Sequence, residues 1–135
     1  MPLLLLRHAH AGERGTWGDD DTTRPLDERG EERALRLVEL LEGYPVSEIL
    51  TSPYTRCVQT VRPLAAARGL EPQLRDELRE DLQWTDGVEL VRSLAGRDVV
   101  VCGHGGLEQA LPDPPKWRKG AVLVVDKSLR VVAEL

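Results

Sequence analysis

The feature that most constrains this chain is a run of four leucines, Leu3 to Leu6, followed at once by Arg7 and His8. A short apolar run that ends abruptly in polar residues is typical of a strand buried on both faces of a parallel sheet. In open α/β sheets, ligands bind at the carboxyl ends of such strands. Because arginine binds oxyanions and a histidine nitrogen can carry a phosphoryl group, the pair indicates a phosphate site with a histidine nucleophile. A helix-capping histidine beside a surface arginine is the alternative for so short a motif.

Size and composition predict a single domain over residues 1–135. The chain is 41% hydrophobic and 30% charged, which is typical of a globular protein with its own core. No apolar run approaches the ~20 residues of a membrane span and no signal peptide is recognisable, so we expect a cytoplasmic protein that binds no membrane. The net charge of −5 argues against binding to nucleic acid. Cys57 and Cys102 lack the spacing of a zinc site or a redox pair.

Apolar periodicity and turn residues predict strands and helices that alternate along the chain. The expected strands cover residues 3–6, 46–50, 70–74, 98–102, 120–125 and 129–135, and the expected helices cover residues 31–42, 53–68, 87–95 and 107–111. Such alternation indicates an α/β fold, a three-layer α/β/α sandwich with a mostly parallel central sheet.

Several residues are typical of helix ends. Asp27 is a good N-cap for the first helix. Ser52 and Pro53 have the residue types preferred at the N-cap and the first position of the second helix. Pro63 is expected to kink or restart that helix, and Gly69 is expected to end it.

A loop is expected between Glu13 and Arg24, because this segment is rich in Gly, Asp and Thr. It contains Trp17 and the acidic run Asp19-Asp20-Asp21. The run is either a metal-binding cluster or a solvated turn. Since no further ligand has a matching spacing, we interpret it as a solvated turn.

Other polar residues follow predicted elements in the same way as Arg7 and His8. Arg56 lies in the first turn of the second helix, where free backbone N–H groups and the helix dipole attract anions. His104 follows the clearest strand among glycines, and Glu80 lies in an acidic segment after the third strand. If these strands are adjacent and parallel, all of these residues meet at one edge of the sheet.

This constellation of residues suits phosphoryl transfer. Arg7, Arg56 and His104 can surround the three phosphoryl oxygens, where charge spreads in the transition state. His8 then attacks phosphorus, and a carboxylic acid such as Glu80 protonates the leaving oxygen and later activates water. Because the arginines supply positive charge, no metal or other cofactor is expected.

The same residues resemble the histidine phosphatase (phosphoglycerate mutase-like) superfamily, in particular its compact SixA-like branch. The resemblance spans roughly Leu3 to Gly106. The similar motifs are Arg7-His8-Ala9 for an RHG or RHA signature, Arg24-Pro25-Leu26 with Gly30 for an RPLxxxG helix entry, Ser52 to Thr60 for SPxxRxxQT, and Gly103-His104 for a strand that ends in GH.

The resemblance implies roles for the site residues. It implies that His8 is the phosphorylated nucleophile and that Arg7, Arg56 and His104 form the phosphate pocket. Glu80 is implied as the candidate proton donor, because family members often carry the acid in an LxE segment. SixA-like proteins can lack this acid.

The resemblance also implies a phosphoglycerate mutase-like fold. Larger members of the family insert a lid over the pocket, and this chain has no room for a lid insertion. His10 is not part of the family signature. It is either a pocket-edge residue or a solvated loop residue, and we favour the solvated loop.

An open site suits a phosphoryl group presented on a protein surface. We therefore expect a SixA-like protein phosphohistidine phosphatase that acts on a histidine phosphotransfer domain or a related protein. The alternative is a small-molecule or nucleotide phosphatase, because parts of the chain resemble the histidine phosphatase domain fused behind MutT-like Nudix hydrolases. In that case Trp17 or Trp84 would stack on a base, although plain packing is the commoner role. A catalytically weak binding module is a third alternative, against which the complete set of site residues argues.

Overall fold

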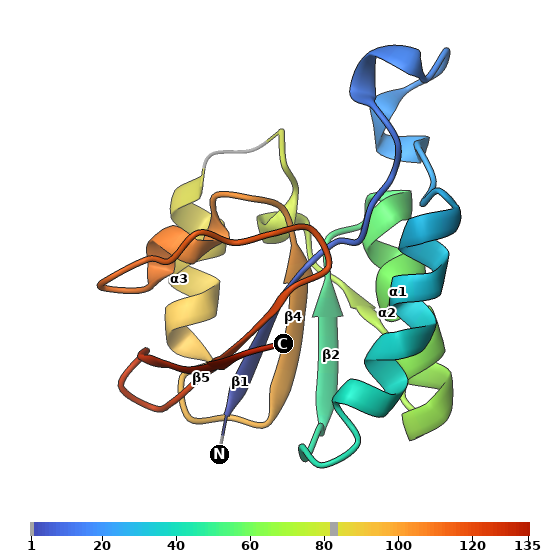
Figure 1. Ribbon diagram of the computed structural model, residues 1–135. Coiled ribbons are helices and arrows are strands. Elements are labelled where there is room, and N and C mark those ends of the chain that lie inside the picture. Colours follow the sequence, from blue (N-terminus) through green and yellow to red (C-terminus); the bar gives the residue numbers. More distant parts are fainter. Residues whose placement is uncertain (1, 82–83) are drawn as a thin grey trace.

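The computed structural model describes residues 2–81 and 84–135 (Figure 1). Its strands are β1 Leu3–Arg7, β2 Glu48–Thr51, β3 Gln73–Leu74, β4 Val99–Gly103, β5 Val122–Val125 and β6 Val131–Glu134. They form one six-stranded sheet in the order β3-β2-β4-β1-β5-β6. The strands β1 to β4 run parallel, whereas β5 pairs antiparallel with β1, and β6 antiparallel with β5. The prediction of a mostly parallel sheet is therefore confirmed.

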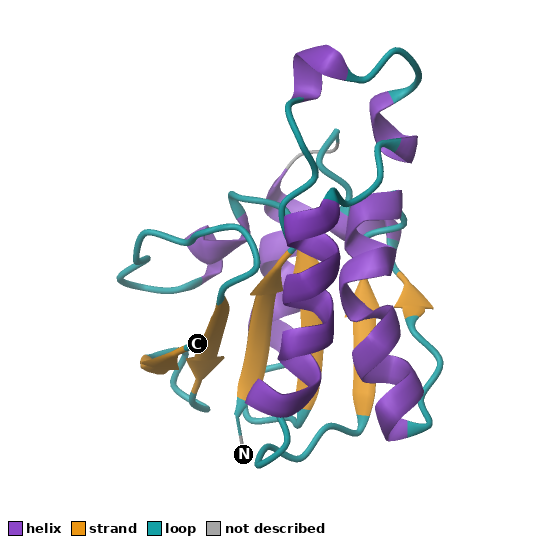
Figure 2. Cartoon of the chain, turned by 45° about the vertical axis from the view of Figure 1, so that its right-hand side comes forward, coloured by secondary structure: helices purple, strands orange, loops and turns teal. Residues whose placement is uncertain are grey.

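Helices cover both faces of this sheet (Figures 1 and 2). Helices α1 (Glu28–Leu40) and α2 (Thr55–Arg68) lie side by side on one face, and α3 (Trp84–Ser93) covers the other. This arrangement confirms the predicted three-layer sandwich. No helix within the described ranges is long and apolar enough to cross a membrane.

The leucines of β1 lie at the centre of the hydrophobic core, and all four are fully buried. Successive side chains of a strand point to opposite faces of its sheet. Leu3 and Leu5 pack in the core layer beneath α3, whereas Leu4 and Leu6 pack in the layer beneath α1 and α2. Because helices cover both faces, both sets of positions must be apolar, which explains the uninterrupted run.

The predicted N-cap of α1 is confirmed. Asp27 Oδ1 accepts a hydrogen bond from the backbone N–H of Gly30 at 2.9 Å. The first turn of α1 also lies directly on the segment after β1, because the backbone N–H of Asp27 donates to the carbonyl oxygen of His10 at 3.1 Å. A Cβ atom on Gly30 would overlap this carbonyl group. Glycine in the RPLxxxG motif therefore allows α1 to approach the end of β1.

The predicted N-cap at Ser52 and the predicted start of α2 at Pro53 are wrong. The helix begins at Thr55, and Tyr54 occupies the N-cap position without a side-chain capping bond. Ser52 Oγ instead lies 2.9 Å from Nε2 of His104 and accepts the backbone N–H of Tyr54 at 3.3 Å. Because its hydroxyl is paired with a side chain from a neighbouring strand end, Ser52 stays outside the helix.

Other differences from the prediction lie at the ends of elements. α2 is one helix through Pro63, so a restart there is wrong, and it ends at Gly69 as predicted. α3 begins at Trp84, earlier than predicted, and β3 is shorter than the strand expected over residues 70–74. The helix predicted over residues 107–111 is a 3-10 turn, η4 Leu107–Ala110. Element ends depend on contacts with neighbouring segments, which propensity alone does not record.

The segment between β1 and α1 rises beyond the carboxyl ends of the parallel strands (Figures 1 and 2). It contains two 3-10 turns, η1 Arg14–Thr16 and η2 Asp21–Thr23. The buried Arg24 guanidinium holds the two sides of this loop together. It donates to the carbonyl oxygen of Ala11 at 2.6 Å and to Asp21 Oδ1 at 2.9 Å. The loop is thus anchored at the edge of the sheet where the predicted site residues lie.

The close approach at Gly30 predicts that Gly30→Ala destabilises the protein. In a free helix, alanine is favoured over glycine by about 1 kcal/mol. Here the added methyl group must push α1 away from His10, and such overpacking costs ~1–3 kcal/mol. We expect a lower free energy of unfolding in urea denaturation. Gly43→Ala, with open space around the new Cβ, is the control and should change this free energy by no more than about 0.5 kcal/mol. A more stable Gly30→Ala variant would contradict the close approach.

Candidate active site

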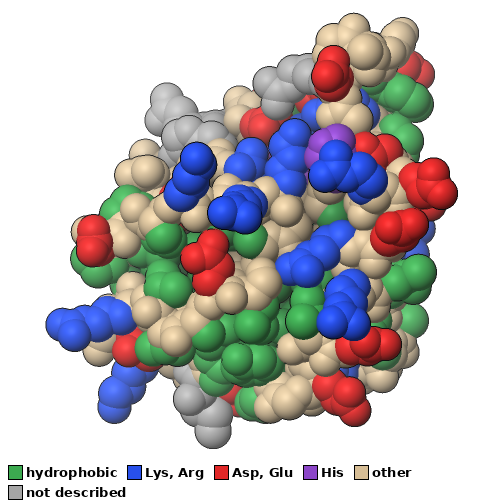
Figure 3. Space-filling view, in the orientation of Figure 1, with side chains coloured by type: hydrophobic (Ala, Val, Ile, Leu, Met, Phe, Trp, Pro, Cys, Tyr) green, Lys and Arg blue, Asp and Glu red, His purple; other side chains and the backbone are tan. Residues whose placement is uncertain are grey.

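Three adjacent strand ends bring the predicted site residues together. Arg7 at the end of β1 lies opposite Gly103 of β4, and the next backbone N–H, that of His8, donates to the carbonyl oxygen of Gly103 at 3.0 Å. On the other side of β4, the backbone N–H of Ser52 donates to the carbonyl oxygen of Cys102 at 2.9 Å. The predicted convergence at one edge of the sheet is confirmed. Figure 3 shows Lys and Arg side chains gathered around a histidine on the upper part of one face.

His8 is only 4% exposed, and one of its ring nitrogens is fixed. Its Nδ1 lies 2.8 Å from the carbonyl oxygen of Ala9. A carbonyl oxygen only accepts hydrogen bonds, so Nδ1 carries the proton and Nε2 keeps its lone pair. Burial lowers the pKa of His8, and the hydrogen bond to Ala9 raises it in part. The charges of Arg56, Arg7 and Lys119 lower it further, and the resulting pKa is about 3. His8 is therefore neutral at pH 7, with a nucleophilic Nε2.

Arg56, in the first turn of α2, is fully buried at 0% exposure. Its guanidinium lies 4.8 Å from the centre of the Tyr54 ring. Nη1 donates to the backbone carbonyl of Asp21 at 2.9 Å, and Nη2 donates to Asp21 Oδ2 at 3.2 Å and to Glu80 Oε1 at 3.1 Å. Its buried Nε has no hydrogen-bond partner among the residues that the structure describes. Because buried donors are rarely left unpaired, this N–H suits an acceptor on a ligand.

Arg7 brings a second guanidinium to the same edge. Its Nη1 donates to the carbonyl oxygen of Trp117 at 2.6 Å. Its Nε is buried and, within residues 2–81 and 84–135, also has no hydrogen-bond partner. The guanidinium packs closely on Gly105, where a Cβ would come within 3.1 Å of Cζ. Arg7 and Arg56 thus each keep one buried N–H suited to an oxyanion.

His104 and Glu80 complete the group of predicted residues. His104 is 0% exposed, and its ring centre lies 5.4 Å from that of His8. Its Nε2 pairs with Ser52 Oγ at 2.9 Å, and its Nδ1 lies 3.7 Å from Glu80 Oε2. The Glu80 side chain, 27% exposed, thus bridges Arg56 and His104. All the predicted site residues meet at one place.

The pocket at this edge has a volume of about 540 Å³. It is lined by Arg7, His8, His10, Gly12, Glu13, Arg24, Glu80 and Lys119. Among these lining residues the cationic Arg and Lys side chains outnumber the Glu carboxylates, which favours an anionic ligand. In the described ranges, no group of three or more His, Cys, Asp or Glu side chains is placed to hold a metal ion.

Two interpretations of the loop after β1 are wrong. His10 is not a solvated loop residue, because it lines the pocket and its Nδ1 is hydrogen bonded to Asp27 Oδ2. Asp19 and Asp20 are exposed, as expected of a solvated turn, but Asp21 is not simply solvated, because its carboxylate pairs with Arg24 and with Arg56. Both errors have the same cause. The local sequence shows that these side chains are polar, but their partners lie on other elements.

Sequence reasoning missed the positioning role of two residues in the SPxxRxxQT motif. Thr60 Oγ1 accepts the backbone N–H of Ala9 at 3.0 Å and donates to the carbonyl oxygen of Arg56 at 2.6 Å. Gln59 Oε1 accepts the backbone N–H of Leu26 at 2.8 Å. These bonds tie α2 to the segments before and after the loop. The motif contains both residues, but nothing in it names their partners.

The two tryptophans considered for base stacking differ in what the structure shows. Trp17 is 38% exposed on the loop after β1, and its Nε1 donates to the carbonyl oxygen of Asp20 at 3.1 Å. The side chain of Trp84 lies outside the described part of the structure. Of the two, Trp17 is therefore the one whose side chain can be assessed, and it is not among the residues that line the pocket.

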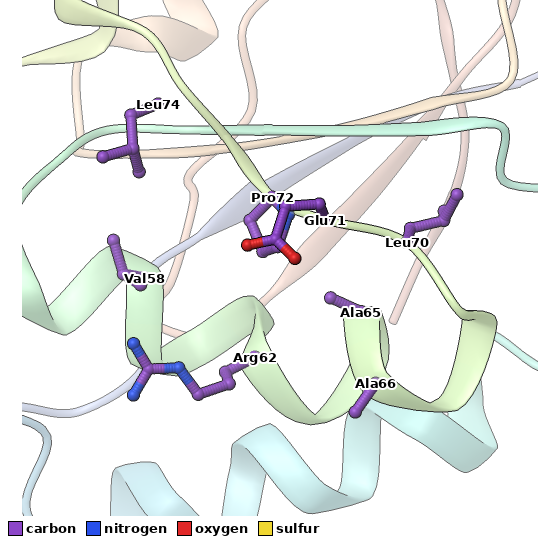
Figure 4. Close-up of a pocket in the computed structure, with 8 residues that line it drawn as sticks. All are labelled: Val58, Arg62, Ala65, Ala66, Leu70, Glu71, Pro72 and Leu74. Carbon is purple, nitrogen blue, oxygen red and sulfur yellow. The ribbon is translucent and has the colours of Figure 1, made fainter.

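A hollow elsewhere on the molecule lacks the chemistry of this pocket. It has a volume of about 430 Å³. Figure 4 shows its lining residues, which come from α2 and from the segment that leads into β3. Its charged lining residues are Arg62 and Glu71, and the others are apolar. None of these lining residues, all in the described part of the chain, is a His, Cys, Ser or Thr. The strand ends therefore remain the candidate active site.

Comparison with known proteins places the chain in a family. The family model of the histidine phosphatase superfamily (branch 1) matches residues 3–89, and the chain belongs to this superfamily. An 8-oxo-(d)GTP phosphatase from Mycolicibacterium smegmatis (strain ATCC 700084 / mc(2)155) is 40% identical over 122 residues, which cover 85% of this chain and 36% of that protein. The chain thus spans about a third of the length of this relative.

Two solved structures share the fold over nearly the whole chain. The protein histidine phosphatase SixA complexed with tungstate has a TM-score of 0.82 and 20% sequence identity, covering 100% of this chain and 96% of that chain. A protein from Agrobacterium tumefaciens, assigned as a phosphohistidine phosphatase SixA, has a TM-score of 0.79 and 25% sequence identity. The match covers 99% of this chain and 96% of that chain. The predicted fold family is confirmed.

The low pKa of His8 predicts a loss of stability at mildly acidic pH. The unfolded chain protonates His8 around pH 6.5, whereas the folded protein does so only near pH 3. The stabilisation by neutral His8 is therefore present above pH 6.5 and is lost as the pH falls from 6.5 toward 3. At ~1.4 kcal/mol per pKa unit, the loss between pH 7 and pH 5 is about 2 kcal/mol.

Urea unfolding at the two pH values tests this prediction, with His8→Gln as the reference protein. Between pH 7 and pH 5, the unchanged protein should lose about 2 kcal/mol more unfolding free energy than His8→Gln does. Equal losses would show that His8 titrates alike in the folded and unfolded states.

Proposed function

We propose that this protein is a phosphatase in which His8 carries the phosphoryl group during turnover. The observation that carries the proposal is the state of His8. Its Nδ1 is hydrogen bonded to the carbonyl oxygen of Ala9 and its pKa is about 3, so Nε2 has a lone pair at neutral pH. Membership of the histidine phosphatase superfamily supports the same class of reaction.

Arg7 and Arg56 are the proposed clamp for the phosphoryl oxygens. Each has a buried Nε–H without a protein acceptor among the described residues, and an oxyanion supplies such an acceptor. Other N–H groups of Arg56 are held by Asp21 and Glu80, which orient its guanidinium. His104 is the third proposed phosphate-binding group. Because the arginines stabilise the charge on the transferred group, the proposed reaction uses no metal ion.

The proposed reaction has two half-reactions. First, Nε2 of His8 attacks phosphorus while the bond to the leaving group breaks, and a phosphohistidine forms. Glu80, on the wall of the pocket, is the proposed proton donor to the leaving group. Water then gives up one proton to a base at the pocket while its oxygen forms a bond to phosphorus. The P–N bond breaks, and its electron pair returns to Nε2 of His8 as inorganic phosphate leaves.

The proposed substrate is a phosphohistidine on a protein, such as a histidine phosphotransfer domain. An imidazole leaving group depends less on a strong acid than an alkoxide does. This suits a site in which the Glu80 carboxylate faces both Arg56 and His104. The similarity to the Agrobacterium tumefaciens structure assigned as SixA supports the same substrate class.

A nucleotide phosphatase is the second candidate, because one observation favours it. The Mycolicibacterium smegmatis relative, an 8-oxo-(d)GTP phosphatase, is 40% identical over 122 residues. Trp17 is exposed on the loop whose ends, Glu13 and Arg24, line the pocket, and it offers an aromatic face on which a base can stack.

His8→Ala should lower the kcat for hydrolysis of p-nitrophenyl phosphate at least about 1000-fold, because the nucleophile is lost. Mass spectrometry of the quenched reaction should find the phosphoryl group on His8 of the unchanged protein, and a chelator should leave its activity intact. Arg36→Ala, on the exposed side of α1, is the control and should keep full activity. Substantial activity in His8→Ala would rule out the proposed intermediate.

Comparison of kcat/KM among substrates decides between the two candidate functions. We expect a phosphorylated histidine phosphotransfer domain to exceed nucleotides and sugar phosphates by at least about tenfold. Trp17→Ala should leave the phosphohistidine reaction unchanged. If nucleotides are the better substrates and Trp17→Ala lowers their kcat/KM by about tenfold, the nucleotide function replaces the first.

A further inference from the structure

His10 and Asp27 form a second imidazole–carboxylate pair at the pocket, outside the residues used so far. Nδ1 of His10 is hydrogen bonded to Asp27 Oδ2, and the ring lines the same pocket as His8. The imidazole is about one-third exposed, so it is open to water as well as to a ligand. In the described part of the chain, its Nε2 has no hydrogen-bond partner.

The segment after β1 alternates between two surroundings. His8, His10 and Gly12 line the pocket, whereas Ala9 and Ala11 are buried in a small cluster beneath α1. Alternate residues of an extended chain face opposite sides. His8 and His10 therefore face the same space, where a phosphoryl group on His8 would lie.

Asp27 is held in place independently of His10. Its Oδ1 accepts the backbone N–H of Gly30 at 2.9 Å, and its Oδ2 accepts that of Gly12 at 3.1 Å. Gly12 has a φ of 65°, a conformation that glycine adopts without strain. Burial raises the pKa of Asp27, but the hydrogen bonds outweigh burial, and the pKa lies below its ordinary value. Asp27 is therefore a fixed carboxylate that orients the imidazole.

A carboxylate partner determines which nitrogen of His10 is basic. The carboxylate only accepts, so Nδ1 of neutral His10 carries the proton and Nε2 keeps a lone pair. We propose that Nε2 of His10, oriented by Asp27, takes the proton from the water that hydrolyses phospho-His8. This inference rests on the proposed function, and it assigns the second half-reaction to a residue outside the family signature.

The proton and electron pairs of this step are accounted for. One O–H bond of water breaks and its proton moves to Nε2 of His10, while the oxygen forms a bond to phosphorus. The P–N bond to His8 breaks, and its electron pair returns to Nε2 of His8. The His10 imidazolium is stabilised by the Asp27 carboxylate and then returns its proton to solvent. Glu80 keeps its proposed role with the leaving group in the first half-reaction, and His10 replaces it in the activation of water that the sequence led us to expect of Glu80.

The two half-reactions can be separated with p-nitrophenyl phosphate, whose leaving group needs little protonation. In stopped-flow measurements, the initial release of nitrophenolate reports formation of phospho-His8, and the steady rate reports its hydrolysis. His10→Gln should slow hydrolysis at least about 100-fold and leave formation within about threefold. Phospho-His8 should then accumulate, which intact-protein mass spectrometry detects.

Asp27→Asn is the matched second variant, because asparagine caps a helix about as well as aspartate does. With its oxygen kept on the backbone N–H of Gly30, its amide N–H group faces Nδ1 of His10 and places the proton on Nε2, which removes the base. The backbone N–H of Gly12 loses its acceptor in the same variant. We expect phospho-His8 to accumulate in Asp27→Asn as in His10→Gln, with an unchanged circular dichroism spectrum. Glu80→Gln should cause no such accumulation.

The outcomes separate this inference from the proposed function. If His10→Gln hydrolyses phospho-His8 within about threefold of the normal rate, the role of His10 is overturned and the proposed function stands. An equal decrease in both half-reactions also overturns it, because it indicates a structural role. If the unchanged protein forms no phospho-His8 and His8→Ala stays active, the proposed function itself fails.

Discussion

The parallel pairing of β1, β4 and β2 is the constraint on which the candidate site depends. These three strands end side by side, so the residues that follow them come together although they are far apart in the chain. Backbone hydrogen bonds continue one residue beyond β1 and β2, where they hold His8 and Ser52 to either side of β4. The backbone N–H groups of His8 and Ser52 therefore find their hydrogen-bond acceptors on β4. The side chains of His8, Ser52 and His104 are left to interact with one another and with a ligand.

Burial and charge act together on His8. A histidine with an ordinary pKa is partly protonated near neutral pH, and a protonated ring has no lone pair on Nε2. Here burial and the neighbouring arginines both disfavour the charged form. Arg56 itself stays buried because it is held by Asp21, Glu80 and the ring of Tyr54. One environment thus keeps the His8 imidazole neutral and surrounds it with positive charge that attracts an anion.

Much of the fold and the core of the site could be predicted because their signals are local. The leucine run identified β1, and Arg7 and His8 were placed correctly because they follow it directly. Arg56 was found by its position in the first turn of a helix. Ser52 was misplaced, because its residue type suits an N-cap equally well and its actual partner, His104, comes from another strand. His10 was also misjudged, since its partner belongs to a helix that begins well after it in the chain.

The sequence by itself determined the order of strands and helices, because apolar periodicity and capping residues such as Asp27 act over a few neighbouring positions. It also determined that Arg7 and His8 stand at the end of a buried strand. Only the tertiary structure decided the protonation state of His8, the pairing of His10 with Asp27 and the insertion of Asp21 beside Arg56. Each of these depends on burial and on charges from distant segments, which a local pattern does not contain.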